Sequence, residues 1–304
     1  MCLILFAHKV HPDFPLVLAA NRDESYARPT QAASFWRDYP QIYAGRDLEM
    51  GGTWLGIARN GRLAAITNFR DANAEKTSQR TRGELVSNFL RGSQGPAEFA
   101  NRVKRDGHNY NGFNLLLGDV DELYYVSNRN GVVTAVAPGV HGLSNSLLNT
   151  PWPKVTQGCE AMSKLMTAKT QDLIDGLFTI LADRTTAADE QLPDTGVGLP
   201  RERTLSPAFI AASGSGTRCS SVVLVNNHGQ VVFVERSFGE RGKQATSVTG
   251  RFSLESAPAS AAASPVSSHE PKRITTWAGE PTSESSHITL AHVDPQPVAA
   301  AGAI

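Results

Sequence analysis

Cys2 is the residue best suited to covalent chemistry, because it directly follows the initiator methionine. Aminopeptidases usually remove a methionine that precedes a small side chain, and the chain would then begin with a thiol and a free α-amine on one residue. A thiolate is strongly nucleophilic, and an α-amine with a pKa of about 7.7–8.0 can act as its base. The alternative is that Cys2 keeps its methionine and opens a buried strand as a small apolar residue.

Three charged residues, Arg22, Asp23 and Glu24, follow the apolar run 16–20. A guanidinium beside the thiol would favour the thiolate, and a carboxylate could hold the α-amine by a charge-assisted hydrogen bond. Because side chains alternate along a strand, Arg22 and Glu24 share one face and Asp23 the other. Both acids therefore stay open as partners of Cys2, and a purely structural salt bridge is the alternative for Arg22.

Side-chain amides and a further arginine complete the candidate catalytic set. Asn68 follows an apolar strand, where its amide can stabilise an oxyanion or end the strand by turn bonding. Asn145 lies in a Leu-Ser-Asn-Ser stretch, for which a turn is also the alternative. Arg218 follows the Gly-Ser loop 213–216 and can face a substrate carboxylate or simply follow a turn. Trp54 could line an apolar pocket or pack in the core.

Short apolar runs bounded by turn signals predict strands, and runs with helical spacing predict helices. The predicted strands cover residues 3–7, 16–20, 53–58, 63–67, 113–118, 123–126, 132–136, 222–225 and 231–234. Helices are predicted over residues 85–90, 96–104, 154–166 and 171–181, the first opened by a capping box at 81–84. Residues 183–207 are predicted to be a long loop. Strands, then helices, then strands favour an α+β fold.

Composition limits the classes of partner. The chain has 304 residues with 29 basic and 29 acidic side chains, which predicts no nucleic-acid partner. No apolar run reaches about 18 residues, so no transmembrane segment is expected. The start has no basic leader and the three cysteines form no CxxC pair, so we expect a cytoplasmic protein, with organelle association left open for a eukaryotic source. His8 and His11 lack an acidic ligand set, so no metal site is predicted.

A change of composition divides the chain. From about residue 256 onward Ala, Ser and Pro dominate and hydrophobic periodicity ends. Such a segment cannot bury enough apolar surface to offset its ordering entropy. We therefore predict one folded domain over residues 1–255 and a disordered tail over 256–304.

The segment 18–24, which ends in Asn-Arg-Asp-Glu, and the start Met1-Cys2 together resemble the NRDE family. This family is also called the transport and Golgi organisation protein 2 family. Further stretches similar to it are 51–56 (GGTWLG), 67–70 (TNFR), 110–114 (YNGFN), 142–145 (GLSN), 150–154 (TPWPK), 216–218 (GTR) and 235–237 (ERS). They run in order through nearly the whole predicted domain.

The resemblance implies a four-layer αββα sandwich, in which helices cover two stacked antiparallel sheets. This is the architecture of the N-terminal nucleophile hydrolases, and the similarity is greatest to their cysteine branch, which includes bile salt hydrolases and penicillin V acylases. By position, the resemblance implies these site residues: Cys2 as nucleophile, Arg22 beside it, Asp23 near the amine, Asn68 and Asn145 at the oxyanion, and Arg218 as a second arginine. The usual Arg-x-x-Asp spacing is absent, which leaves Asp23 and Glu24 both open.

Two functions follow as hypotheses. The first is an amide hydrolase or acyl transferase that works through a Cys2 acyl-enzyme on a small-molecule amide and requires no cofactor. The second is a binding or trafficking protein on the same scaffold with haem or acyl-CoA as cargo, a role that the resemblance implies. The predicted ligand-binding residues are Glu24, Arg70, Trp54 and Asn114. The oligomeric state is left open.

Overall fold

Two antiparallel sheets form the frame of the protein in a computed structural model that describes residues 2–72 and 80–255. The six-stranded sheet has the order β10 (Gly139–Leu143), β1 (Cys2–His8), β2 (Leu16–Ser25), β11 (Ser215–Val225), β12 (Gln230–Phe238), β13 (Gln244–Ser253). The seven-stranded sheet has the order β3 (Thr30–Phe35), β4 (Ile42–Asp47), β5 (Leu55–Ala58), β6 (Leu63–Asn68), β7 (Phe113–Gly118), β8 (Leu123–Ser127), β9 (Val133–Ala135).

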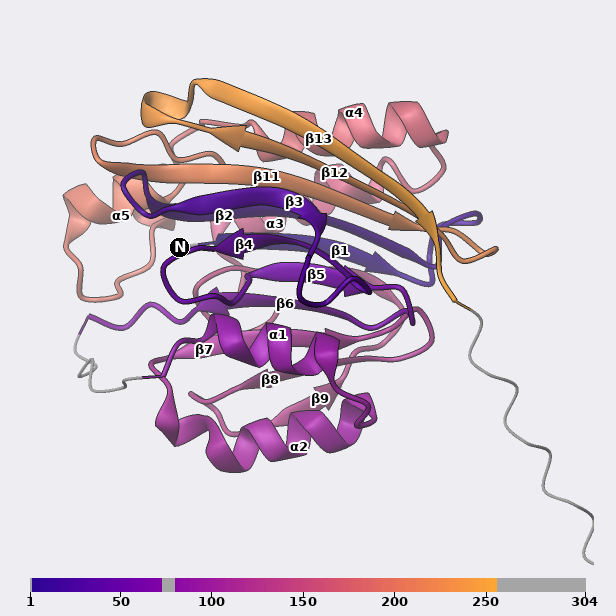
Figure 1. Cartoon of the computed structure of the whole chain (residues 1–304). Helices are drawn as coiled ribbons and strands as arrows, with labels where there is room; N and C mark the ends of the chain where they lie inside the picture. Colours follow the sequence, from indigo (N-terminus) through magenta and orange to yellow (C-terminus); the bar gives the residue numbers. More distant parts are fainter. Residues whose placement is uncertain (1, 73–79, 256–304) are drawn as a thin grey trace, which may run out of the picture. The chain divides into compact units, whose positions relative to one another are not determined.

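Helices cover the outer face of each sheet (Figure 1). The helices α1 (Gly83–Arg91) and α2 (Pro96–Asp106) pack on the seven-stranded sheet, and α3 (Pro153–Ser163) and α4 (Thr170–Leu181) on the six-stranded sheet. A fifth helix, α5 (Leu199–Leu205), lies between α4 and β11 in the chain. The predicted α+β fold with αββα layers is confirmed.

The alternation of buried side chains explains why β1 and β2 lie between layers. Ile4 and Phe6 of β1 belong to the core that also contains residues of the second sheet, such as Leu115. Leu3 and Leu5 belong to the core shared with α3 and α4. Burying each such side chain stabilises the fold by about 1.5–3 kcal/mol. This period of two fixes which face each polar residue at the end of β2 occupies.

Most predicted elements are present, and the differences lie at edges and in polar segments. The predicted strands and helices all match described elements, but β3, β4, β10 and β13 were not predicted. The predicted capping box is wrong, because Arg82 is the N-cap of α1 and no side chain caps it. The segment 183–207 is not simply a loop, since it contains α5 and a short 3-10 turn, Asp189–Gln191. Residues 256–304 lie outside the described residues.

None of the helices among the described residues combines the length and the apolar character that a bilayer-spanning helix requires.

Candidate active site

The pairing of three neighbouring strands brings two thiols to the sides of one guanidinium. Cys2 of β1 lies opposite Arg22 of β2, and Arg22 lies opposite Cys219 of β11. Residues directly opposite each other in antiparallel strands point to the same face of the sheet. Because Ile4 and Ala20 on these strands join the core between the sheets, Cys2, Arg22 and Cys219 also face the second sheet.

The Asn-Arg-Asp-Glu stretch of β2 divides its side chains between the two faces. Asn21 faces the helices, where its amide donates to the carbonyls of Leu181 and Ala208, both at 2.8 Å. Arg22 and Glu24 lie on the other face and approach each other to 3.9 Å. Asn21 therefore has a structural role that attaches β2 to its helix layer, while the charged residues after it shape the site.

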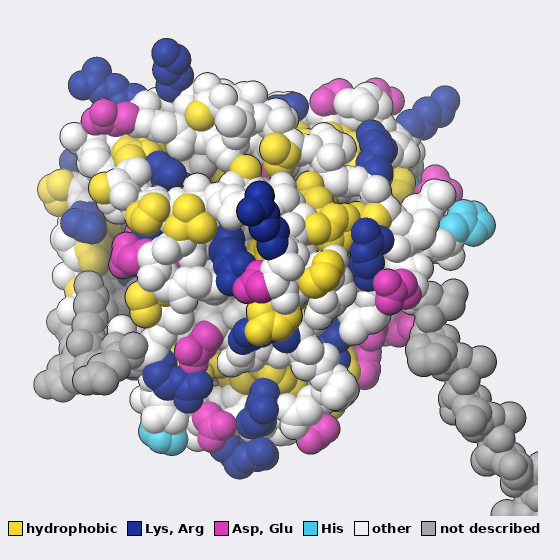
Figure 2. Space-filling model, in the orientation of Figure 1, with side chains coloured by type: hydrophobic (Ala, Val, Ile, Leu, Met, Phe, Trp, Pro, Cys, Tyr) yellow, Lys and Arg dark blue, Asp and Glu magenta, His cyan; other side chains and the backbone are white. Residues whose placement is uncertain are grey.

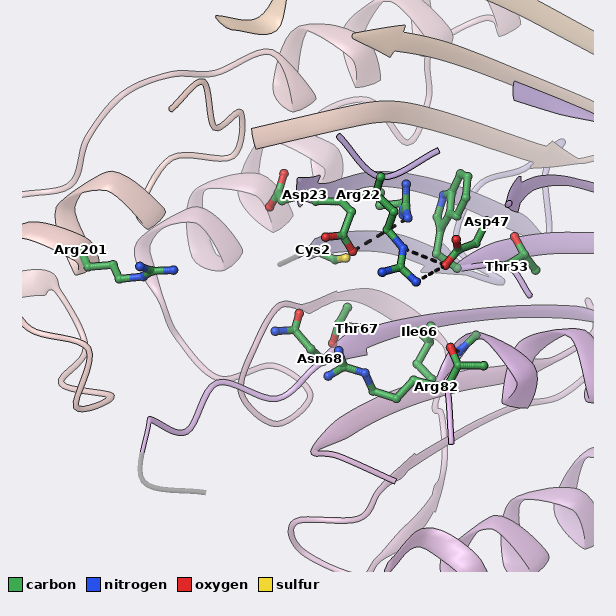
Figure 3. A pocket seen from close by; sticks show the side chains of 15 residues that line it. Cys2, Arg22, Asp23, Asp47, Thr53, Ile66, Thr67, Asn68, Arg82 and Arg201 are labelled. Carbon is green, nitrogen blue, oxygen red and sulfur yellow. Dashed lines mark hydrogen bonds and ion pairs between the residues drawn. The ribbon is translucent and has the colours of Figure 1, made fainter. Parts of the chain in front are cut away.

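A cavity of about 440 Å³ opens between the two sheets at this end of β1 and β2 (Figure 3). Its volume lies within the range of small-molecule sites. Its walls come from the ends of β1, β2, β4 and β6, from the start of α1 and from α5. The lining residues are Cys2, Arg22, Asp23, Glu24, Arg28, Asp47, Thr53, Trp54, Ile66, Thr67, Asn68, Thr81, Arg82, Gly83 and Arg201.

Cys2 is half-buried at this cavity, and its surroundings disfavour the thiolate form. Burial raises the pKa of Cys2, and the nearby Asp23 carboxylate raises it further, whereas the Arg22 guanidinium is the weakest of the influences that oppose the rise. The backbone carbonyl of Cys2 accepts a hydrogen bond from Ser144 Oγ at 3.0 Å, which fixes the strand at this point. A nucleophilic role for Cys2 therefore requires a base that takes the thiol proton during attack.

Arg22 is held in one orientation by groups from both sheets. Its Nη1 donates to Thr30 Oγ1 at 3.0 Å, and its guanidinium carbon lies 4.2 Å from the ring centroid of Trp54. The side chain of Arg22 is only 6% exposed, and the Glu24 carboxylate is its described charge partner. Trp54 and Glu24, both predicted ligand-binding residues, thus line the cavity and also position Arg22.

Asn68 and Asn145 lie side by side, although 77 positions separate them. Asn145 is fully buried, and its Nδ2 donates to the backbone oxygen of Asn68 at 2.9 Å and to its Oδ1 at 3.0 Å. Only Asn68 lines the cavity. Because Asn145 holds the oxygen of the Asn68 amide, the Asn68 Nδ2 is the donor left for a cavity ligand. In this geometry Asn145 orients Asn68.

Asp23 faces the helix layer, where it is surrounded by buried charges. Its Oδ1 accepts from Thr217 Oγ1 at 2.7 Å. Burial raises the pKa of Asp23, while the positive charge of Lys154 and the Thr217 hydrogen bond oppose this rise. Lys154 of α3 is 5% exposed and donates from Nζ to the Leu205 carbonyl at 2.8 Å. Burial lowers the pKa of Lys154 to about 8.

A buried ion pair connects this region to α5. Arg70 donates from Nη1 to Glu202 Oε2 at 2.5 Å, and both side chains are less than one-tenth exposed. Glu202 also accepts from the backbone nitrogen of Thr195 at 3.0 Å. This arrangement fixes α5 beside the cavity, so that the preceding residue, Arg201, is positioned at the cavity wall.

Besides Asn145, three predicted residues are not among those that line the cavity. Arg218 lies at a bulge in β11 and donates to the backbone carbonyl of Tyr26 at 2.8 Å. Arg70 pairs with Glu202 and contributes to a separate open hollow with Trp152. Asn114 is fully buried, with its amide nitrogen directed at Thr67 Oγ1 and the Ser146 carbonyl. The geometry therefore gives these three residues contacts within the protein.

Several residues of the cavity wall were not predicted from the sequence, notably Arg28, Asp47, Arg82 and Arg201. Arg82 enters the site because the backbones of Gly52 and Gly83 touch. A Cβ atom on Gly52 would lie 2.6 Å from the carbonyl carbon of Gly83, so a larger residue there would separate the segments. The GGTWLG stretch contains Gly52, so this motif was the feature of the sequence that could have pointed to the contact with the start of α1.

Fold and site together define an αββα sandwich whose first strand begins with a cysteine at a polar, arginine-rich cavity. The chain belongs to the family described as Transport and Golgi organisation 2, whose profile matches residues 1–240. The family membership that the sequence motifs predicted is thereby confirmed.

Relatives cover most of this chain. It is 36% identical to the Transport and Golgi organization protein 2 homolog of Bos taurus over 281 residues, which is 84% of this chain and 100% of the bovine protein. It is 36% identical to the homologue of Homo sapiens over 265 residues, 79% of this chain and 94% of the human protein. The Drosophila melanogaster protein is 26% identical over 265 residues, 78% of this chain and 92% of its own.

Solved structures are similar at a lower level. A mutant of the conjugated bile acid hydrolase from Clostridium perfringens has a TM-score of 0.45 and 8% identity, covering 84% of this chain and 92% of that chain. The Caenorhabditis elegans N-acylethanolamine-hydrolyzing acid amidase ortholog has a TM-score of 0.44 and 9% identity, covering 73% and 92%.

Proposed function

We propose that this protein is an N-terminal-cysteine hydrolase or acyl transferase that acts on a linear amide through a Cys2 acyl-enzyme. One observation carries the proposal: the Cys2 thiol lines a ligand-sized cavity in register with Arg22, and a positioned amide donor, Asn68, lines the same cavity. Nucleophile, fixed positive charge and oxyanion donor are the groups that acyl transfer needs within reach of one carbonyl.

The α-amine of Cys2 supplies the base once Met1 is removed. It takes the thiol proton as Sγ attacks the carbonyl carbon, and the carbonyl electron pair moves to oxygen. The Nδ2 of Asn68 donates to that oxyanion. When the intermediate collapses, the C–N bond breaks and the α-ammonium gives its proton to the leaving amine. Water then attacks the thioester and releases the acid, or a second amine attacks and completes acyl transfer.

Arg22 and Asp23 have supporting roles in this mechanism. The Arg22 guanidinium lowers the pKa of Cys2 against the effect of burial. Asp23, the next residue along β2, provides a carboxylate for the α-ammonium that forms during attack. Lys154 counteracts the burial that would otherwise raise the pKa of Asp23, and thus helps to keep this carboxylate ionised.

The second candidate function is non-catalytic binding of haem or acyl-CoA as cargo. The observation in its favour is that four arginines, Arg22, Arg28, Arg82 and Arg201, line the cavity. Guanidinium groups suit the propionates of haem and the phosphates of acyl-CoA. Titrating the Cys2→Ser variant with each cargo would support this function through saturable binding, and its absence would exclude it. For either function we propose a reducing compartment such as the cytoplasm, where Cys2 stays a thiol.

A burst experiment tests the catalytic proposal. The processed protein is mixed with a p-nitrophenyl acyl ester, and the first turnover should release about one p-nitrophenol per chain before steady state. A matched variant with a lysine inserted between Met1 and Cys2 retains its methionine, and so keeps the thiol but lacks the adjacent free amine. It should lose the burst. A folded, processed protein without a burst would contradict the proposal.

A further inference from the structure

The four arginines of the cavity differ in whether the protein neutralises them. Arg28 donates to Asp47 at 2.7 Å and approaches Glu49 at 3.2 Å. Arg22 has Glu24 at 3.9 Å. These two guanidinium groups on the β2 side of the cavity are therefore matched by carboxylates.

Arg82 and Arg201 lack such partners among the residues that the structure describes. Arg82 is half-buried at the start of α1, and the one described hydrogen bond of its side chain runs from Nη1 to the neutral Gly112 carbonyl at 3.0 Å. Arg201 of α5 has no described side-chain hydrogen bond or ion pair. Both line the cavity that contains Cys2, and Figure 3 shows Arg201 extending from α5 toward Cys2.

Both positions are built into the fold. The close backbone contact between Gly52 and Gly83 positions the start of α1, and with it Arg82, at the cavity wall. The buried ion pair between Arg70 and Glu202 positions α5, which carries Arg201. The Cys2 thiol and the Glu24 carboxylate lie close enough to Arg82 to affect its pKa, although burial is the larger influence and lowers it. Figure 2 shows basic and acidic side chains interspersed over the visible face, so no continuous basic surface is visible there.

We propose that Arg82 and Arg201 form an anion subsite, and that the substrate is an amide that carries a carboxylate or phosphate group beside its scissile bond. This inference rests on the proposed function and adds the substrate class to it. Among the described residues, Arg22 and Arg28 have carboxylate partners and Arg82 and Arg201 have none. An anionic oxygen group on the substrate would supply that partner. Arg82 and Arg201 then act as specificity residues, and Cys2 as the nucleophile.

Alkylation of Cys2 tests the subsite without requiring amide hydrolysis. Three probes share a chloroacetamide group and differ in their end: N-chloroacetylglycine, its neutral glycinamide analogue, and N-chloroacetylaminomethylphosphonate. In each, the S–C bond forms as C–Cl breaks and chloride leaves. Rates are measured by intact mass and divided by the rates with free N-acetylcysteine.

In the wild type, at least one anionic probe should react about tenfold or more faster than the neutral probe, as expected for a charge-assisted hydrogen bond to the probe. A greater preference for the carboxylate or for the phosphonate identifies the kind of anion. Arg82→Met and Arg201→Met should each remove most of this preference, which is measured within each variant as the ratio of the rate with the anionic probe to the rate with the neutral probe. The matched controls are Arg91→Met on α1 and Arg203→Met on α5, whose side chains contact Tyr39 and Asp189, respectively, and do not line the cavity.

Equal rates for the anionic and neutral probes in the wild type would overturn the subsite, and so would a loss of preference in the controls as large as in Arg82→Met and Arg201→Met. Because chloroacetamides need only a thiolate, these outcomes are independent of the burst experiment. A protein with an anion preference but no burst would keep the subsite as a binding feature and reject the hydrolase, whereas a burst without the preference would do the reverse.

Discussion

Cys2 and Cys219 lie on opposite sides of Arg22 in one sheet, and both side chains face the second sheet. Cys219 is 3% exposed, and burial together with the Glu235 carboxylate raises the pKa of its thiol well above the usual value. Cys2 is half-buried and lines the cavity that also contains Asn68. Both thiols therefore lie in register with the same guanidinium, that of Arg22. What separates them is that Cys2 lines a cavity that can admit a ligand and that also contains an amide donor, Asn68.

The largest expected effect comes from exchanging each thiol for a hydroxyl. Cys2→Ser should lower acyl turnover on the order of 10⁴-fold or more, because the nucleophile is lost. Cys219→Ser changes a buried thiol without access to the cavity and should leave turnover within about twofold of the wild type, in keeping with a residue outside the machinery. Steady-state rates with the p-nitrophenyl ester measure both, and circular dichroism checks folding. Equal losses would remove the distinction between the two sites.

Alkylation in the folded state should separate the thiols by rate. Iodoacetamide should reach Cys2 directly, whereas Cys219 reacts only when the sheet opens, so its rate should be on the order of 10³-fold lower. Peptide mapping over time measures each site, and denaturant should make the two rates converge. If Cys219 reacted in the folded protein as fast as Cys2, our account of its burial would be wrong.

The Asn68 amide should contribute to acylation of Cys2 and not to simple alkylation of its thiol. Asn68→Ala removes the donor from the cavity and should slow acylation by about 10²–10³-fold, corresponding to about 2.7–4 kcal/mol of transition-state stabilisation. Alkylation of Cys2 by iodoacetamide has no oxyanion and should be almost unchanged. The burst rate and the alkylation rate of Asn68→Ala are each compared with those of the wild type. A parallel fall in both rates would indicate a structural role for Asn68.

The smallest effect concerns the pH dependence of Cys2. Because burial and the Asp23 charge raise its pKa, the alkylation rate should keep climbing above pH 8.5, the usual thiol value, as the thiolate forms. Asp23→Asn removes one negative charge, so the midpoint should move to lower pH and the rate at pH 7.5 should rise by less than about tenfold. The exposed Asp13→Asn is the control. A midpoint that moved upward would contradict the stated influence of Asp23.

The sequence was sufficient to predict the pairing region of the site because periodicity defines β1 and β2. Apolar runs on both sides of a short connection placed Cys2 near Arg22, and alternation placed Glu24 with Arg22. The exact register, in which Cys2 lies opposite Arg22, depends on which side chains pack into each of the two hydrophobic cores. No local sequence pattern predicts this packing.

Residues that enter the site through tertiary contacts could not be predicted. The stretch 81–84 fits a capping box as well as a cavity wall, and the distant contact of Gly83 with Gly52 decides between them. The polar helix α5 shows little hydrophobic periodicity in its sequence. It is held in place by the buried ion pair between Arg70 and Glu202, which is a tertiary contact. The strand β13 is largely exposed at a sheet edge, so its apolar pattern is weak.

The most direct test of the central claim is the mass of the N-terminal peptide after acid quenching during the p-nitrophenyl ester reaction. Our account predicts a peptide that lacks Met1, begins at Cys2 and carries one acyl group as a thioester on Cys2. A folded, fully processed protein whose Cys2 stays unmodified, or in which the acyl group lies on Cys159 or Cys219, would contradict it.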